Sequence, residues 1–584
     1  MRRTAASAGQ AAHDKRRIGH WLLGPTQLKL RCDDETRRKL KHRPRSSGVN
    51  LAMDIPADRP MDPADRPMDH PRHDGLQRPL EQPLQPQQPE QLQQTPLHRV
   101  AIVGTGLAGL STAYLLQNDS QKRYAADSLS FDSASVAVKN TTTGITERVD
   151  LPMRAAAGGY YDNLLRLYHH LRIPLHPIRF LFVFAKAPPP TDAAAKVKTE
   201  PRRTDLTATE QAIAAPGTYF VHASNLHQML PPWPGNRGVI PHLVEILYLI
   251  ICHFWFSVAC FAVQPLAAST SRDGGESFAD YVQRIWLPRR YVSHYLLPLI
   301  SSVSTCSHNE LLAFPASDVV NYKKQSHGQQ HYTVCGGVSQ VQLRLAEGLK
   351  DIRLSTRVVE VVPGANQSDV TVRWQSTDGS AQITEQTFDR VVLAVSPDVA
   401  GSIFKPLRST LNKIPTLRVE SSVLRPGAAK GESATFEVDD GAGEDPMTCA
   451  HHLGDTSPSQ VITLKTRFSE TNGSQTEALH VMPGGVVVST CPLDGAPDLK
   501  QVLKTARFTR TLRTTESRAV IEKIMGGSRG TSKKTDGDAT SGWVNGEDNV
   551  WLVGAWCWDG MVLLEGCIVS AMRVAGDFGV TVPF

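Results

Sequence analysis

Three glycines between a buried strand and a helix constrain this chain more than any other feature. Val100–Val103 read VAIV, a β-branched run typical of a strand buried on both faces, and Leu107–Leu116 have the apolar spacing of a helix. Gly104, Gly106 and Gly109 lie between the strand and the first turn of that helix. In this context the pattern predicts a dinucleotide-binding turn, because Gly104 permits the tight turn, Gly106 lets the backbone approach a pyrophosphate, and Gly109 allows close helix packing.

The start of this helix completes the predicted phosphate site. The backbone N–H groups of Leu107 and Ala108 and the helix dipole would face the phosphate charge. The alternative is an ordinary strand-to-helix turn that holds no ligand.

The acidic residue that should follow is harder to place. A site of this kind usually has an Asp or Glu about 20 residues beyond the glycines, at the end of the second strand, to hold the ribose hydroxyls. After the helix the chain reads QNDSQKRYAADSLSFDSASVAVKN, without an apolar run of strand length. We therefore expect the second strand to be missing, as after a short deletion. By spacing, Asp127 is the nearest candidate for the ribose and Asp132 the next, whereas Asp119 is assigned to a turn.

Four separated segments together resemble the flavin-containing amine oxidase and phytoene desaturase superfamily. In chain order they are RVAIVGTGLAGLSTAYLL, HYTVCGGVSQVQLRLAEGLKDIRLSTRVVEVV, FDRVVLAVSPDVAGSIF and VWLVGAWCWDGMVLLEGCIVSAMRVAG. The resemblance spans about Val100 to Gly576, with long inserts that do not match. It implies an α/β fold: a doubly wound, Rossmann-type FAD-binding domain with an interleaved α+β substrate domain. It also implies noncovalent FAD, since the family's covalent flavin-cysteine motif is not matched by Cys557 or Cys567.

The resemblance also suggests further cofactor residues. The backbone near Val358 would face the adenine, and Gly554 would allow close backbone approach after a second buried strand. Leu564, Glu565 and Gly566 begin a helix that could point N–H groups at the flavin ring or the diphosphate, although Glu565 could simply cap that helix.

The sequence leaves the catalytic residues unknown. Trp556 and Trp558 are candidates near the flavin ring, with core packing as the alternative. No Lys matches a family motif, so Lys323, Lys324 and Lys465 are not assigned a role. We expect no metal site, and the pair His451 and His452 is expected at the surface.

Composition divides the chain into folded segments, a tail and inserts. Residues 51–98 hold 10 Pro and 8 Gln, including the repeat ADRPMDP/ADRPMDH, so we expect a disordered N-terminal tail. The expected order is the tail at 1–98; FAD-binding segments at 99–185, 331–400 and 549–584; substrate-domain segments at 218–330 and 401–525; and flexible inserts at 186–217 and 526–548.

The positive charge of the chain belongs to the tail. Residues 1–50 hold 13 Lys and Arg against 4 Asp and Glu, which leaves the remaining residues with a net charge of −3. No nucleic-acid partner is therefore expected. The nine cysteines form no CxxC pair, and the N-terminus has no apolar run of signal-peptide length. We expect an intracellular protein, with a mitochondrial presequence as the alternative to a cytosolic start, and we do not expect secretion.

An uncharged segment at 246–263 (ILYLIICHFWFSVACFAV) reaches the length at which a membrane span is considered. One crossing would separate the glycine turn from the FAD-binding segments that follow it, and Tyr291–Val303 is too short and polar to return the chain. We therefore favour a helix that lies in one leaflet, with buried core of the substrate domain as the alternative; His253 would then be a packed or interfacial residue.

These features predict an FAD-dependent oxidoreductase that transfers a hydride from an apolar or amine substrate to flavin N5. The alternatives are a lipid or polyene desaturase or isomerase on the same fold, and a degenerate, membrane-associated flavoprotein without activity. The partners considered are a small, apolar substrate and a membrane surface; the sequence does not indicate an oligomeric state.

Overall fold

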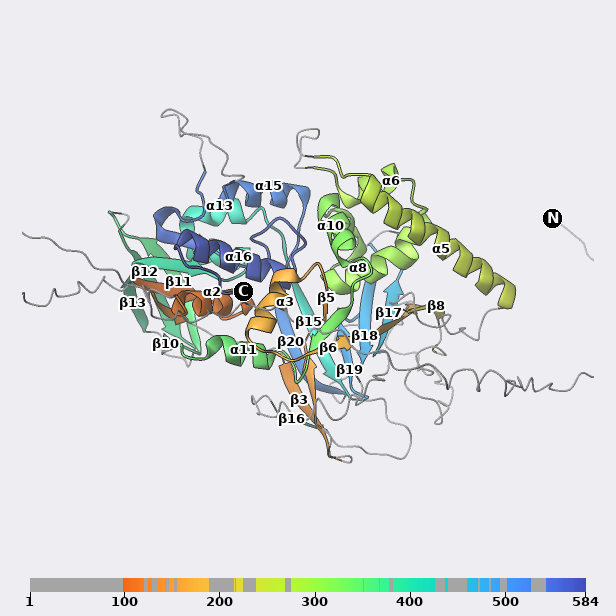
Figure 1. Cartoon of the computed structure of the whole chain (residues 1–584), viewed down its shortest axis with the longest axis horizontal. Helices are drawn as coiled ribbons and strands as arrows, with labels where there is room; N and C mark the ends of the chain where they lie inside the picture. The colour runs from red at the N-terminus through yellow and green to blue at the C-terminus, as the bar shows by residue number, and fades with distance from the viewer. Residues whose placement is uncertain are drawn as a thin grey trace, which may run out of the picture. The chain divides into compact units, whose positions relative to one another are not determined.

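A five-stranded parallel sheet carries the glycine turn. Its strand order is β10-β2-β1-β14-β21, with every pair parallel. The strands are β1 (His98–Val103), β2 (Tyr124–Ser128), β10 (Asp351–Ile352), β14 (Arg390–Leu393) and β21 (Val550–Leu552). They come from three stretches of the chain that are far apart in sequence, so the sheet forms only when these stretches meet (Figure 1).

The computed structural model describes most of the chain after the N-terminal tail. The described residues are 98–584 except 120–123, 129–134, 142–143, 145, 152–154, 189–214, 216, 224–237, 268–274, 350, 367, 378–381, 426–435, 440–459, 471–472, 483–484, 494–500 and 527–541. The tail predicted at 1–98, apart from His98, and most of the inserts predicted at 186–217 and 526–548 lie outside the described residues. The described part belongs to one compact unit, Gln91–Phe584.

The two faces of the parallel sheet have different covers. Val100 and Ile102 of β1 pack in one cluster with the helices α2 (Leu107–Gln117) and α16 (Leu564–Asp577). Ala101 and Val103 pack on the opposite side, because alternate residues of a strand point to opposite faces. A strand buried on both sides explains the unbroken β-branched run, and the Rossmann-type α/β fold class is confirmed.

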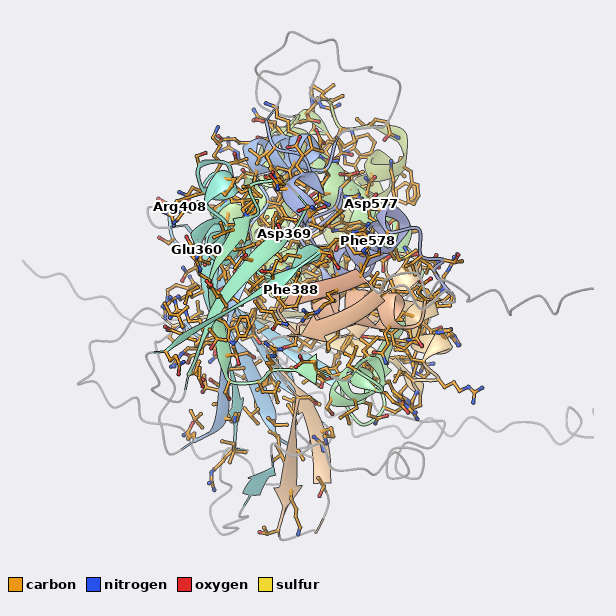
Figure 2. The ribbon with its side chains drawn as sticks, turned by 90° about the vertical axis from the view of Figure 1, so that its left-hand side faces the viewer. Glu360, Asp369, Phe388, Arg408, Asp577 and Phe578 are labelled. Carbon is orange, nitrogen blue, oxygen red and sulfur yellow. The ribbon has the colours of Figure 1, made fainter. Side chains whose placement is uncertain are left out.

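A small antiparallel sheet forms the cover on that second side. It consists of β11 (Thr356–Pro363), β12 (Val370–Ser376) and β13 (Ile383–Phe388). Figure 2 faces this sheet, with Glu360 of β11 and Phe388 of β13 labelled. The same side also holds α12 (Pro397–Ile403), η3 (Lys405–Leu407), α13 (Arg408–Leu411) and α15 (Thr515–Ile524).

The second strand is present, which corrects the expectation of a deletion. β2 pairs in parallel with β1 from His98↔Tyr124 to Ile102↔Ser128, and β10 pairs with its other edge. Its sequence, YAADS, has no run of large apolar residues, so pattern reasoning missed it. Strand formation depends strongly on the neighbouring strands. Here β1 and β10 pair with β2 on both sides and stabilise a strand that its own sequence does not predict.

A mixed seven-stranded sheet organises the substrate part. Its order is β20-β15-β19-β18-β17-β7-β8. The strands are β7 (Phe180–Lys186), β8 (Thr218–Ala223), β15 (Thr416–Leu424), β17 (Gln460–Arg467), β18 (Gln475–Val481), β19 (Val487–Thr490) and β20 (Val502–Thr511). β7 pairs with β17, although all of β7 except Lys186 falls in the range 99–185 that we expected in the FAD-binding domain.

Helices gather on one side of this sheet (Figure 1). They are α5 (Val239–Ala262), α6 (Phe278–Arg284), α7 (Arg289–Tyr291), the π-helix η2 (Val292–Leu296), α8 (Leu297–Ser304), α9 (His308–Leu312) and α10 (Ala316–Ser326). α5 begins before the predicted segment 246–263 and so includes Glu245. Tyr291–Val303, rejected above as a membrane span, forms the last residue of α7, η2 and most of α8, and most of its apolar side chains belong to the main core cluster.

Two further small sheets and two helices connect these parts. One sheet contains β16 (Phe436–Asp439), β3 (Ser135–Asn140) and β4 (Thr146–Asp150). The other contains β5 (Ala155–Ala157), β9 (His331–Val334) and β6 (Leu175–Ile178). The remaining elements are α3 (Asp162–His170), α11 (Ser339–Ala346) and η4 (Glu547–Asn549).

Candidate cofactor and active site

The three glycines of the turn have three different surroundings. Gly104 has a φ of +106°, and a Cβ there would lie 2.5 Å from the carbonyl oxygen of Ala394. A Cβ on Gly109 would lie 1.9 Å from the carbonyl oxygen of Gly104. Gly106, in contrast, caps α2 with extended backbone, and a Cβ there would meet no atom within 4 Å. Gly104 and Gly109 are therefore needed by the turn itself, whereas Gly106 leaves space in front of the N-terminus of α2.

A cavity opens beside this turn. Its volume is about 420 Å³, within the range of small-molecule sites. It is lined by Val103 and Gly104, by β11 residues including Arg357 and Val358, and by α12 residues. The structure thus brings Val358 next to the glycine turn, where the resemblance placed the adenine. Arg357, which sequence reasoning did not select, adds a cation to the lining.

The ribose candidates lie at different places. Asp127 is the fourth residue of β2, in register with Ala101 of β1 and Asp351 of β10, near the carboxyl end of the strand. Dinucleotides bind outside the carboxyl ends of parallel strands, so this position suits the ribose role, which stays a prediction. Asp119 is buried after the end of α2, and Asp132 lies outside the described residues.

The C-terminal segment places two further glycines against the tryptophans. Gly554 has a φ of +155°, and its N–H donates to Ser570 Oγ of α16 at 3.0 Å. A Cβ on Gly566 would lie 2.3 Å from Cδ1 of Trp558. Both glycines thus let the chain between β21 and α16 fold tightly, and α16 lies beside α2 (Figure 1). Contact of these glycines with the cofactor stays a prediction.

Both tryptophans make internal hydrogen bonds. Trp556 is buried and donates from Nε1 to the carbonyl oxygen of Val395 at 3.0 Å, next to the residues that line the cavity. Trp558 is half-buried and donates to the carbonyl oxygen of Met561 at 3.0 Å, with Tyr160 edge-on to its ring. Core packing accounts for Trp556 as it stands; contact of either ring with flavin remains a prediction.

Glu565 joins two helices. Its Oε1 accepts from the backbone N–H of Asn163 at 3.0 Å and from Asn163 Nδ2 at 2.7 Å, and its Oε2 accepts from the N–H of Leu164 at 3.0 Å. The carboxylate therefore caps α3 and not its own helix α16. Burial raises the pKa of Glu565, against these hydrogen bonds, which lower it. The carboxylate is thus engaged with α3, and the cofactor role that the sequence suggested for Glu565 stays a prediction.

Removing this carboxylate should destabilise the fold. Glu565→Ala leaves the buried N–H of Leu164 and the part-buried donors of Asn163 without their acceptor, so we expect the free energy of unfolding to fall by about 2–4 kcal/mol. Urea unfolding measures the change. Glu516→Ala, an exposed acid in the first turn of α15, is the control. A loss no larger than that of the control would contradict the role of Glu565 as a link between α3 and α16.

A buried arginine holds the tryptophan loop. Arg513, 1% exposed, donates from Nη2 to the carbonyl oxygens of Trp556 at 3.2 Å, Trp558 at 2.9 Å and Gly560 at 3.3 Å. Its Nε lies 4.0 Å from Oδ2 of Asp318, which is fully buried and also pairs with Arg518. Burial raises the pKa of Asp318 and lowers that of Arg513. Sequence reasoning missed this group, because its members are nearly 200 residues apart and match no motif.

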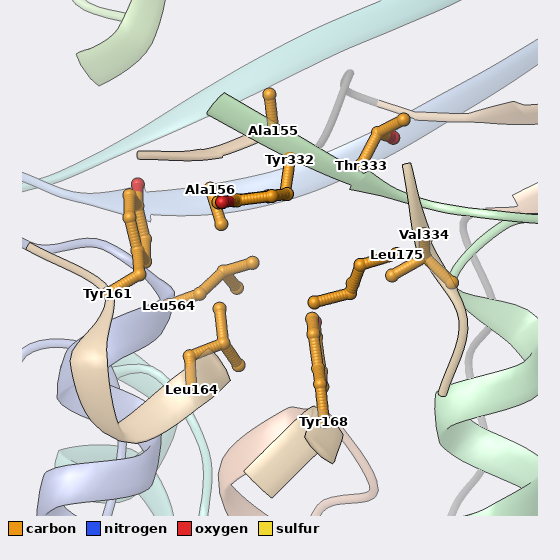
Figure 3. A pocket seen from close by; sticks show the side chains of 10 residues that line it. All are labelled: Ala155, Ala156, Tyr161, Leu164, Tyr168, Leu175, Tyr332, Thr333, Val334 and Leu564. Carbon is orange, nitrogen blue, oxygen red and sulfur yellow. The ribbon is translucent and has the colours of Figure 1, made fainter. Parts of the chain in front are cut away.

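A second, much smaller pocket lies at the N-terminus of α16 (Figure 3). Its volume is about 10 Å³, room for one water. Side chains from several elements converge on it, among them Leu564 of α16, Leu164 and Tyr168 of α3, and Leu175 of β6. The remaining lining residues are Ala155, Ala156, Tyr161, Tyr332, Thr333 and Val334, so every lining side chain is uncharged.

The other residues considered from the sequence lie elsewhere. Lys323 and Lys324 of α10 contact His253 and Gln264 at 3.5 and 3.1 Å, and Lys465 lies on β17. None of these three lysines is among the residues lining either cavity. His451 and His452 lie outside the described residues. Within the described part, no group of three or more potential metal ligands lies together.

Two family models match the segments that build this site. The model of the NAD(P)-binding Rossmann-like domain matches residues 102–171, which contain the glycine turn, β2 and α3. The model of flavin-containing amine oxidoreductases matches residues 301–577, which contain β10, β14, β21, Arg513 and α16. The chain belongs to the flavin-containing amine oxidase superfamily. It is therefore an FAD-dependent oxidoreductase.

Solved structures of two oxidases and an isomerase cover most of the chain at low identity. A putative protoporphyrinogen oxidase from Exiguobacterium sp. 255-15 is 13% identical, covering 82% of this chain and 98% of its own, with a TM-score of 0.43. Cyclohexylamine oxidase from Brevibacterium oxydans IH-35A is 11% identical, with coverages of 83% and 100% and a TM-score of 0.45. A fatty acid isomerase from P. acnes that produces CLA is 10% identical, with coverages of 82% and 98% and a TM-score of 0.46. Similarity at this level says nothing of the substrate. The comparison with curated proteins gave no match.

The residues present fit the adenosine diphosphate part of FAD. The open space at Gly106, the free end of α2 and the adjoining cavity are what an adenosine diphosphate group requires. The pocket at the N-terminus of α16 is too small for a flavin ring, so no part of FAD is assigned to it.

Proposed function

We propose that this oxidoreductase acts on an apolar amine. The C–H bond beside the nitrogen breaks, and its hydrogen leaves with the electron pair. FAD supplies the hydride acceptor, N5 of its ring. The observation that carries the proposal is the uncharged lining of the pocket at the N-terminus of α16.

The uncharged lining supports an apolar substrate because it offers no partner for further charged groups on the substrate. A second cationic or anionic group on the substrate would lose its hydration there without gaining a partner, which is costly in a low-dielectric site. The aliphatic side chains of Leu164, Leu175 and Leu564 offer dispersion contacts instead, and the rings of Tyr161 and Tyr168 offer broad apolar faces. Burial raises the pKa of Tyr161 well above its ordinary value, so this phenol stays neutral.

The protein's own contribution is binding and exclusion of water. α2 and the glycine turn would fix the diphosphate, Arg513 holds the loop of the two tryptophans, and Glu565 fixes α3 as one wall of the pocket. Because the pocket has room for one water, the substrate enters only when the wall opens, and it then displaces solvent from the reacting bond. No catalytic base is assigned.

Anaerobic reduction of the bound flavin tests the proposal. The protein is mixed with dodecylamine, with spermidine, or with a conjugated polyene, and the loss of the flavin absorbance band is followed. We expect dodecylamine to reduce the flavin with an apparent second-order rate constant at least about 100-fold above that for spermidine, because spermidine would bury extra charges. Equal rates, or no reduction by dodecylamine, would contradict the proposal.

The desaturase or isomerase alternative keeps the same pocket. The uncharged lining favours it as well, because a polyene needs no charged partner. Flavin reduction by the polyene alone would favour a desaturase, and a shifted double bond without net reduction would favour an isomerase. The degenerate alternative rested on the missing second strand, and the presence of β2 removes that argument.

A further inference from the structure

One face of α5 exposes a continuous apolar stripe. Nineteen large apolar side chains of the described residues are exposed, and eleven of them lie on this helix. The eleven are Val239, Ile240, Leu243, Val244, Leu247, Ile250, Ile251, Phe254, Trp255, Val258 and Phe261. They recur at helical spacing along the whole helix, about 36 Å long at 1.5 Å per residue. Soluble proteins rarely expose apolar patches of this extent unless something covers them.

The stripe carries no charge. The only acidic or basic residue of α5 besides its two histidines is Glu245, which is buried. Its carboxylate accepts hydrogen bonds from Arg290 Nη2 at 2.7 and 2.8 Å and from the hydroxyl of Tyr295. Burial and the nearby Lys323 lower the pKa of His253 to about 4, so this ring is neutral at physiological pH. The acid of the helix thus faces the protein and is neutralised there.

Tryptophan and arginine border the stripe. Trp255 donates from Nε1 to the carbonyl oxygen of Ile285 at 2.7 Å, which places it beside the next residue, Trp286. Trp286 is 87% exposed, and it is followed closely by the exposed Arg289 and Arg290. Tryptophan favours the level of lipid headgroups, and arginine attracts anionic headgroups. An apolar stripe bordered by tryptophan and arginine is therefore suited to bind a bilayer surface.

The inner face of α5 fixes the orientation. Cys252, Phe256 and Cys260 are buried in the main core cluster. The hydroxyl of Tyr281 donates to the carbonyl oxygens of Ala259 and Val263, both at 3.1 Å. Figure 1 shows α5 along the outer edge of the helical layer, with α10 beside it. By length and composition α5 is long and apolar enough to cross a membrane, but spanning would pull this inner face and Glu245 out of the protein.

We propose that the outer face of α5, together with Trp286 and Arg289, docks in the plane of a bilayer that contains anionic phospholipid. The apolar stripe enters the boundary between headgroups and acyl chains, and the arginine contacts the headgroups. The proposal stands apart from the substrate, since it concerns a surface and not the pocket.

Vesicle flotation of the full-length protein tests this surface. Vesicles of phosphatidylcholine with phosphatidylserine are compared with vesicles of phosphatidylcholine alone, and the floating fraction is measured at low and high salt. We expect binding that is stronger with phosphatidylserine and persists at high salt, because apolar insertion is not screened. Loss of binding at high salt would overturn the proposal. It would mean that the protein binds the vesicles by charge alone, for example through the basic residues 1–50.

Matched variants separate the face from general surface chemistry. Leu247→Glu with Phe254→Glu places two charges on the stripe, and Ile383→Glu with Leu354→Glu places two at similarly exposed apolar sites elsewhere. We expect the first pair to lower the bound fraction roughly 10-fold or more and the second to leave it unchanged, with flavin content equal in both. Equal binding by both pairs would overturn the proposal. A second result would also overturn it: the wild type does not float and forms a dimer by light scattering, and only Leu247→Glu with Phe254→Glu dissociates that dimer. A second copy of the chain would then cover the stripe.

Discussion

Gly106→Val should yield a folded protein without flavin. No atom lies within 4 Å of a Cβ at this position, so the valine side chain fits the apoprotein. It then occupies the space in front of α2 through which the pyrophosphate approaches the backbone N–H groups. We expect FAD affinity to fall by about 100-fold or more, because the phosphates lose both contact and the helix terminus. Cofactor content after purification and titration of the apoprotein with FAD measure the effect.

Two other glycines make this test specific. Gly542→Val changes a glycine with equally open surroundings outside the turn, and it should keep wild-type flavin content. Gly109→Ala should instead impair folding, since its Cβ would lie 1.9 Å from the carbonyl oxygen of Gly104. Stoichiometric flavin in Gly106→Val would show that the turn does not bind the cofactor.

Arg513→Met should give the largest loss of stability. Methionine has similar length but cannot donate to the carbonyl oxygens of the tryptophan loop, and it removes one of the two arginines that lie beside the buried Asp318 in the described part of the chain. Removing one partner from a buried charged group typically costs about 3–5 kcal/mol. We expect a loss of this size in urea unfolding. We also expect weaker FAD binding, because the loop that leads from β21 into α16 loses its anchor.

The control for this variant is an arginine on the strand β20, which ends just before Arg513. Arg507 of β20 pairs with Glu420 at 3.0 Å, but its side chain is 77% exposed. Exposed ion pairs contribute little, so Arg507→Met should change the unfolding midpoint only slightly. If Arg513→Met cost no more than Arg507→Met, the buried arginine would not be holding the loop.

The parts of the fold that could be predicted are those coded locally. Val100–Val103 and the three glycines specify a strand, a turn and a helix within a few residues, and the structure has each of them. β2 could not be predicted, because Tyr124–Ser128 become a strand through pairing with β1 and β10, which are neighbours in space. The same reason explains Glu565: its acceptor role depends on α3, about 400 residues earlier in the chain.

The apolar segment illustrates a different limit. Composition identified 246–263 as apolar, but it could not divide the residues between a buried and an exposed face. The helix starts at Val239, and Glu245 pairs with Arg290, which lies 45 residues further on. This pairing, together with the burial of Cys252, Phe256 and Cys260, shows which side of the helix is uncharged and exposed. Arg513 was missed for a similar reason, since a buried arginine acquires its partners from tertiary structure alone.

The absorption spectrum of the purified full-length protein, with mass identification of the cofactor released on denaturation, tests the central claim most directly. The glycine turn, the cavity beside it and the complete parallel sheet predict FAD, released without cleavage of a covalent bond and present at near-equal stoichiometry. A protein that stays free of flavin after reconstitution with excess FAD would contradict the account, even if it is folded.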